Sequence, residues 1–294
     1  MALTVVITIA LLVLSVGIIG SYFKFPRPTF GGRRLWTDLR IQNSWRVQRH
    51  VRTGKCRLLD EKDWQWHVGD EASQIGAMNQ NIQEGAIAAS RPHAVVLVHG
   101  LGRSNHCLFA LARTFKKQGY EVIDFNYASN QATIEIHAAS LNRCLDALHG
   151  VETVHFVTHS LGGIVLRKAF AERSNWNEQL KLGRAVLITA PNQGSAVARI
   201  LCGYTLLNSL FGPPLRQLSD PHLGEFSPLP LPFATIGATV NYLPLLKGEN
   251  DTLVTVEESK LKGAEQHLTV KASHAFVMSN KQVITFVCDF LGTH

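Results

Sequence analysis

Three polar residues that could act together in nucleophilic catalysis follow separate apolar runs of this 294-residue chain. They are Ser160 in "VHFVTHSLGG", Asp251 in "GENDTLVTVEESKL" and His274 in "VKASHAFVMSN". A serine hydroxyl is a weak nucleophile unless a neighbouring base takes its proton. Histidine is the usual base, and an aspartate can orient the imidazole ring and stabilise its charged form. The order serine, aspartate, histidine therefore predicts an acyl-transfer site, although each residue alone has an ordinary structural explanation.

The stretch around Ser160 is typical of a sharp turn between a strand and a helix. The usual form, G-x-S-x-G, has small residues two places before and after the serine because the turn is crowded. Gly162 fills the second place, whereas Thr158 stands in the first. Threonine is short and favours the extended backbone of a strand, so we expect the turn to form. The N–H of Leu161 would then face the reacting carbonyl. The alternative is that Ser160 only caps the following helix.

A second turn with free backbone N–H groups is expected in "VLVHGLGRS", where a strand ends at His99-Gly100. Glycine lets the backbone approach a bound group closely, and Gly100 and Gly102 provide it here. Free N–H groups at such a turn can stabilise an oxyanion. The alternative is a tight turn without a chemical role.

The elements that position these turns alternate between short apolar runs and helix-like stretches. Short valine-rich runs fit buried parallel strands, and their alternation with helices predicts an α/β fold with a doubly wound, mostly parallel sheet. Ligands bind such sheets beyond the carboxyl ends of the strands, where the three polar residues are expected. The expected strands are 93–100, 120–127, 153–158, 184–190, 233–239 and 266–272, and the expected helices are 105–117, 133–148, 161–173 and 280–291.

The chain from about residue 93 to 291 resembles the α/β-hydrolases of the lipase and esterase kind. The resemblance rests on "VVLVHGLGRS", "THSLGG", "APNQGSAVA" and the pair "NDTLVTVEES" and "SHAFVM". It implies the α/β-hydrolase fold and a serine hydrolase that cleaves carboxylic esters, with acyl or lipid esters as substrates and no cofactor. A thioesterase or amidase with the same triad, and a binding protein of this fold without catalytic activity, are the alternatives.

The resemblance also implies a role for each residue of the site. It makes Ser160 the nucleophile, Asp251 the acid and His274 the base. The N–H groups of Leu101 and Leu161 would form the oxyanion hole.

Some positions around the site depart from the family pattern or leave a choice open. Thr158 and Thr252 stand where the family often has glycine, the second directly after the acid. Glu249 and Glu257 are the other candidates for the acid. His159 occupies a position that is often histidine in lipases, where it lies outside the triad, so we leave it out.

Residues 199–232 lie between two expected strands, where this fold inserts a cap over its site. The segment is apolar, with Gly, Pro and a phenylalanine in its middle. These features suit a short cover over an acyl-binding groove. Ordinary packing helices are the alternative.

The first 23 residues are expected to form a membrane anchor. Residues 2–23 contain no charged side chain, and roughly 20 apolar residues span a bilayer. A cleaved signal peptide would have a basic start, a shorter apolar core and a cleavage site, none of which is evident. A buried soluble helix is the remaining alternative. We therefore divide the chain into the anchor at 1–23, a basic segment at 24–90 and a hydrolase domain at 91–294.

The positive charge of the chain is concentrated directly after the expected anchor. Between Lys24 and Arg57 there are ten Lys or Arg and one acid, Asp38, whereas the rest of the chain is almost neutral. The positive-inside rule places such a segment, and the body after it, on the cytoplasmic side. The basic segment could also contact anionic lipid headgroups. A periplasmic body on an uncleaved anchor is the alternative.

Other ligands and structures receive little support from the sequence. A nucleic-acid-binding protein would need a basic face across the folded domain. The five cysteines lack metal-ligand spacing, and no phosphate-binding loop is present, so we expect neither a metal nor a nucleotide. Residues 24–90 are expected to provide a tether and edge structure, with short strands at "SWRVQRHV" and "CRLLD" and a helix within "EASQIGAMNQNIQEGAIAAS".

Overall fold

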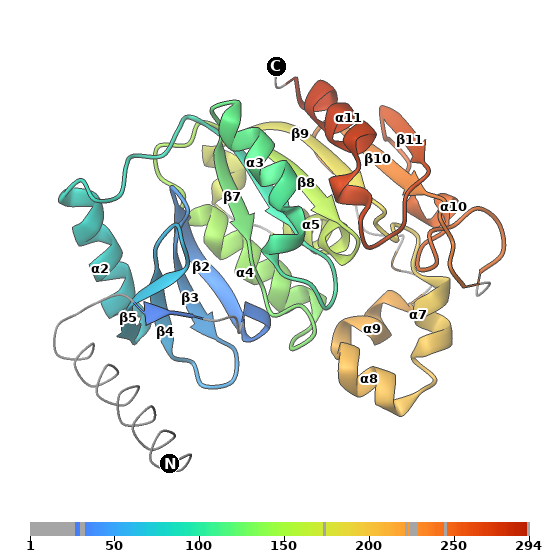
Figure 1. Ribbon diagram of the computed structural model, residues 1–294, viewed down its shortest axis with the longest axis horizontal. Coiled ribbons are helices and arrows are strands. Elements are labelled where there is room, and N and C mark those ends of the chain that lie inside the picture. The colour runs from blue at the N-terminus through green and yellow to red at the C-terminus, as the bar shows by residue number, and fades with distance from the viewer. Residues whose placement is uncertain are drawn as a thin grey trace, which may run out of the picture.

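The structure, a computed structural model, describes residues 27–29, 33–172, 175–220, 223, 229–243 and 246–292 (Figure 1). The expected anchor at 1–23 lies outside these residues. No helix within the described ranges is both long enough and apolar enough to span a bilayer.

A six-stranded parallel sheet forms the centre of the molecule, with strand order β11-β10-β9-β8-β6-β7. Every neighbouring pair in it is parallel, as the alternation of apolar runs with helices predicts. The strands are β6 (His93–Val98), β7 (Glu121–Phe125), β8 (Thr153–His159), β9 (Lys181–Ile188), β10 (Phe233–Ala238) and β11 (Gln266–Val270).

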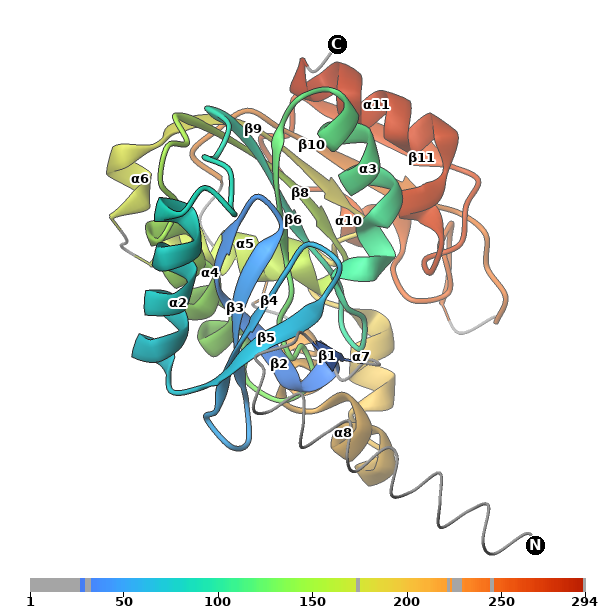
Figure 2. The same ribbon diagram turned by 60° about the vertical axis from the view of Figure 1, so that its left-hand side comes forward.

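Both faces of this sheet are buried because side chains of successive strand residues point to opposite faces. Val95 and Leu97 of β6 pack with α3 and α11, whereas Val96 and Val98 pack with α4 and α5. Figure 2 shows these helices on the two sides of the sheet. The prediction of a doubly wound sheet is therefore confirmed. The helices are α3 (Phe109–Lys117), α4 (Ile134–Asp146), α5 (Leu161–Ala171), α6 (Trp176–Gln179), α10 (Val256–Ser259) and α11 (Lys281–Leu291).

Three short helices follow β9 and form a separate lobe beyond the strand ends, which we call the cap (Figure 1). They are α7 (Ala196–Leu201), α8 (Thr205–Phe211) and α9 (Pro213–Leu218). The cap occupies most of the expected insertion at 199–232 but begins three residues earlier, after Ser195 caps the first turn of α7.

The basic N-terminal segment is a folded unit, which corrects the expectation of a tether with edge structure. Its sheet is antiparallel, with strand order β1-β5-β4-β3-β2, and α2 packs on it. The two expected strands and the expected helix are present as β3, β4 and α2. The elements are β1 (Arg27–Pro28), β2 (Trp36–Gln42), β3 (Trp45–His50), β4 (Cys56–Leu59), β5 (Trp64–Gly69) and α2 (Glu71–Gln83).

Some of the arginines in this unit have buried side chains. Arg46 is buried and pairs with Asp38 at 3.0 Å and with Asp124 of β7 at 2.6 Å. Asp38 also accepts hydrogen bonds from the N–H of Asn126 and from the Gln48 amide, and burial raises its pKa to about 6. These bonds join the antiparallel sheet to the central sheet. Arg46 and the buried Arg40 and Arg57 are therefore not available to lipid headgroups, so the expected contact with lipid would depend on the other Lys and Arg of the segment.

Candidate active site

Ser160 lies on a strained turn between β8 and α5. Its φ of 54° and ψ of −124° are rare for a residue with a side chain, and such backbone costs of order 1–3 kcal/mol. The surrounding sheet holds this conformation, since the Ser160 N–H donates to the carbonyl of Ile188 at 2.9 Å. The Ser160 side chain forms no capping bond to α5, so the geometry disfavours the alternative that it is only a helix cap.

The turn is crowded on the side of Gly162, as the sequence predicts. A Cβ on Gly162 would lie 2.3 Å from the carbonyl oxygen of Val98, far inside van der Waals contact. Thr158 is completely buried, and the neighbouring space is free because residue 163 is also glycine. A Cβ on Gly163 would lie 3.2 Å from the Thr158 hydroxyl oxygen. The same Cβ would lie 2.6 Å from the Ala190 Cβ, so the second glycine of "SLGG" leaves room for Ala190 and also for the threonine that replaces the usual glycine before the serine.

The structure brings Ser160, His274 and Asp251 together in one chain of hydrogen bonds. The Nε2 atom of His274 lies 3.0 Å from the Ser160 Oγ, and its Nδ1 atom lies 2.7 Å from Asp251 Oδ2. The other carboxylate oxygen of Asp251 accepts from the N–H groups of Leu253 and Val254 at 3.0 and 2.8 Å. Asp251 is thus a buried carboxylate with its acceptors filled, and it holds the imidazole with Nε2 toward the serine.

The two other candidates for the acid do not reach this histidine. Glu249 is exposed in the loop before Asp251. Glu257 is exposed on α10 and pairs with Lys260 at 2.6 Å. The geometry therefore selects Asp251.

Thr252, which follows the acid, has the backbone conformation that glycine adopts most easily. Its φ is 88°. Hydrogen bonds compensate for the side chain: its N–H donates to the Asn250 side chain at 3.0 Å, and its hydroxyl donates to Asn241 and accepts from the N–H of Tyr242. These bonds explain how threonine replaces glycine at this position without moving Asp251.

His99 fixes the turn that carries the Leu101 N–H. The N–H of Tyr127 donates to His99 Nε2 at 3.3 Å, so the proton of the neutral ring sits on Nδ1, which donates to the Gly100 carbonyl at 2.9 Å. Burial lowers the pKa of His99 to about 4, which keeps the ring neutral. Since C=O and N–H point in opposite directions across a trans peptide, this bond turns the Leu101 N–H away from His99.

The N–H groups of Leu101 and Leu161 remain available to a ligand. Among the described residues neither has a hydrogen-bond acceptor, and that of Leu161 is at the positive end of α5. Leu101 lines the same cavity as Ser160.

Two side chains that sequence reasoning did not assign to the site hold the loop that carries His274. His159 is buried, and burial followed by the charge of His274 lowers its pKa well below the usual range, so it is neutral. Its Nε2 donates to the His274 carbonyl at 3.0 Å. Arg103 donates to the next carbonyl, that of Ala275, at 2.9 Å. The sequence shows a histidine directly before the serine, but it gives no signal that His159 bonds to the backbone carbonyl of His274.

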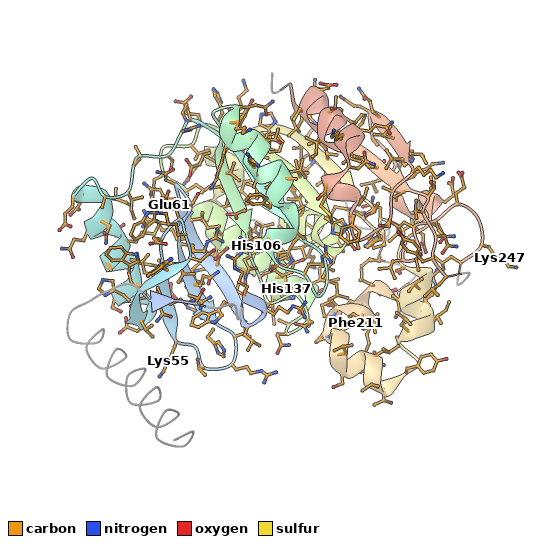
Figure 3. All side chains as sticks on the ribbon, in the orientation of Figure 1. Lys55, Glu61, His106, His137, Phe211 and Lys247 are labelled. Carbon is orange, nitrogen blue, oxygen red and sulfur yellow. The ribbon has the colours of Figure 1, made fainter. Side chains whose placement is uncertain are left out.

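A cavity of about 190 Å³ opens beside Ser160 and is walled mainly by apolar side chains. Phe211 of the cap, labelled in Figure 3, is one of them and is the phenylalanine expected in the insertion. Among the described residues no group of three His, Cys, Asp or Glu is arranged to hold a metal ion. The apolar lining consists of Leu101, Pro191, Val197, Ala198, Leu201, Phe211, Leu215, Leu218, Leu253, Val254 and Ala275.

The buried His99 makes the stability of the protein depend on pH. The unfolded chain binds a proton near pH 6.5, whereas the folded His99 binds it only near pH 4. We therefore expect stability to be lost as pH falls from 6.5 to 4, with a slope of about 1.4 kcal/mol per pH unit from this residue. Denaturant unfolding at pH 7.5, 5.5 and 4.5 measures the slope. The slope of the unfolding free energy against pH should decrease in His99→Asn. It should not change in His106→Asn, which replaces an exposed histidine. Equal slopes in the two variants would contradict the assignment of this pH dependence to His99.

Known structures with the same fold include two hydrolases. A mature lipase of Bacillus licheniformis superposes with a TM-score of 0.56 at 21% identity, over 67% of this chain and 91% of the lipase. An esterase of Exiguobacterium antarcticum superposes with a TM-score of 0.51 at 13% identity, over 70% of this chain and 93% of the esterase. No protein-family model and no curated protein matches the chain. At these identities the likeness establishes the α/β-hydrolase fold of the chain.

Proposed function

We propose that this protein is a serine hydrolase that cleaves carboxylic esters, with Ser160 as nucleophile, His274 as base and Asp251 as the acid that orients it. The observation that carries the proposal is the continuous chain of hydrogen bonds from Asp251 through His274 to the Ser160 hydroxyl. This chain meets an apolar cavity at a strained turn, where a nucleophile is exposed to a substrate.

The reaction proceeds through an acyl-enzyme. Ser160 Oγ attacks the ester carbonyl while His274 Nε2 takes its proton, and Asp251 stabilises the imidazolium. The N–H groups of Leu101 and Leu161 donate to the oxygen that becomes negative. The bond to the alcohol then breaks, and the alcohol oxygen receives the proton from His274. Water, deprotonated by His274, releases the acid and restores the Ser160 hydroxyl.

Acyl or lipid esters are the substrates that suit the cavity. Its cap side presents Leu201, Phe211, Leu215 and Leu218, which would bury the methylenes of an acyl chain. Each methylene that is buried in the cavity contributes about 0.8 kcal/mol of favourable free energy. The rate should therefore rise with acyl length until the cavity is filled.

We also propose that residues 1–23 anchor the protein in a membrane as a single span, with the catalytic domain on the cytoplasmic side. The 22 uncharged residues at 2–23 and the Lys and Arg that follow them support this proposal. The outer face of the cap also exposes apolar side chains, of which Leu206 is 79% exposed and Leu210 is 59% exposed. Such side chains suit an enzyme that takes its substrates from a lipid surface.

Ester hydrolysis can be tested with p-nitrophenyl esters of increasing chain length, alongside a thioester and an amide of the same acyl group. We expect the esters to be cleaved fastest. Ser160→Ala and His274→Ala should each lower kcat by about 10⁴-fold or more, because triad members act as a unit. Ser140→Ala, a half-buried serine of α4 that does not line the cavity, is the matched control and should be unaffected. A Ser160→Ala protein with the original rate would refute the proposal.

The anchor can be tested in the full chain by alkaline extraction of membranes. The original protein should remain in the membrane pellet. The double variant Leu11→Arg, Leu14→Arg should be released, because each arginine costs about 2.5–3.5 kcal/mol on insertion. A tag at residue 294 should be digested only after protease gains access to the cytoplasmic face. Extraction of the original protein, or digestion from the opposite face, would show the anchor or the orientation to be wrong.

A further inference from the structure

Arg103 stands out among the residues that line the cavity beside Ser160. Apart from Arg103 and the two histidines of the site, His159 and His274, the cavity is lined by uncharged residues in the described part of the chain. Arg103 is therefore its one permanently charged side chain, since arginine does not lose its proton in proteins. A charge beside an apolar cavity is costly unless a partner compensates it.

The Arg103 guanidinium has donors to spare. One nitrogen donates to the Ala275 carbonyl at 2.9 Å, and the side chain also reaches the Cys107 sulfur. Its Nε is buried and has no acceptor among the described residues, so an anion in the cavity would be held by the two Nη groups. No described carboxylate pairs with it, in contrast to Arg46, which has two. A guanidinium offers five N–H donors, so Arg103 can take an anion without giving up the Ala275 bond.

The position of Arg103 decides which half of an ester would carry the anion. The departing alcohol oxygen must lie against His274 Nε2, because that atom returns the proton to it. Arg103 is bonded to Ala275, the residue after His274, and comes from the turn after Gly100, not from the cap. The acyl half, in contrast, has the leucines and Phe211 of the cap as its apolar wall. Arg103 therefore lies on the side of the alcohol.

We propose that Arg103 binds an anionic group on the alcohol half of the substrate, and that the natural substrates are acyl esters of alcohols that carry a phosphate or a carboxylate. This inference rests on the proposed ester hydrolysis and adds its substrate class. The chemical step is unchanged: the acyl–oxygen bond breaks, the alcohol leaves with the proton from His274, and Arg103 exchanges no proton. Its guanidinium holds the anion with two parallel N–H bonds, which suit both phosphate and carboxylate.

The inference can be tested with three octanoyl esters that differ only in the alcohol: glycerol, glycerol 3-phosphate and lactate. The original protein should cleave an anionic ester with a kcat/KM about tenfold or more above that of the neutral ester, since a hydrogen bond between charged groups is stronger than one between neutral groups. The glycerol 3-phosphate and lactate esters distinguish phosphate from carboxylate. The readout is the ratio of anionic to neutral ester within each variant, which a general loss of structure does not change.

Two variants of Arg103 and one control separate recognition from a structural role. In Arg103→Gln the ratio should fall to about one, mainly through KM, and in Arg103→Lys much of it should return because the charge is restored. Arg113→Gln removes an exposed arginine of α3 outside the cavity and should keep the original ratio. A ratio near one in the original protein, or an Arg103→Gln variant that loses both activities equally, would overturn the inference.

Binding to the Ser160→Ala protein keeps this test separate from the proposed function. The octanoyl glycerol 3-phosphate or lactate ester should bind this protein more tightly than octanoyl glycerol, and adding Arg103→Gln should abolish the difference. Absence of cleavage together with this binding preference would refute the hydrolase proposal but support an anion site at Arg103. Cleavage without any preference in rate or binding would refute the anion site alone.

Discussion

The strained backbone at Ser160 is the constraint on which the site depends. A positive φ at a residue with a side chain persists only where the surroundings determine it completely. Here β8 and β9 hold the residue from one side through the Ser160 N–H, and α5 approaches the end of β6 so closely that only glycine fits at position 162. The apolar packing of helices on both faces of the sheet keeps these elements in place. The free energy of packing the core thus offsets the strain at Ser160, whose hydroxyl is held exposed at the edge of the sheet.

The other parts of the site are held by bonds between its loops. His99 fixes the carbonyl of Gly100, while His159 and Arg103 fix the two consecutive carbonyls at 274 and 275. Both histidines have a lowered pKa because they are buried, so they act as neutral donors. The loop with the base is therefore tied both to the residue before the nucleophile and to the turn with the Leu101 N–H. A displacement of the His274 loop would therefore also shift the turn at Ser160 and the turn that carries the Leu101 N–H.

The sequence predicts the central sheet from the pattern of its apolar runs, and it predicts the meeting of Ser160, Asp251 and His274 from their order after expected strands and from the resemblance to the α/β-hydrolases. Continuous apolar runs identify the parallel strands, and the carboxyl ends of such strands meet at one edge. The N-terminal sheet was harder to predict, since buried Arg46, Asp38 and Gln48 give its strands the polarity of a solvated surface. The parts played by His159 and Arg103 were also hidden, because each donates to a loop carbonyl whose position no residue type encodes.

The most direct measurement of the central claim is mass spectrometry of the protein after reaction with a fluorophosphonate, which reacts only with an activated serine. We expect one adduct, located on Ser160 in the folded protein and absent when the protein is unfolded in denaturant before reaction. Labelling should also slow strongly in Asp251→Asn, in which the ring of His274 is no longer held in the required tautomer. An adduct on another serine, or equal labelling of the folded and unfolded protein, would contradict the assignment of Ser160 as the nucleophile.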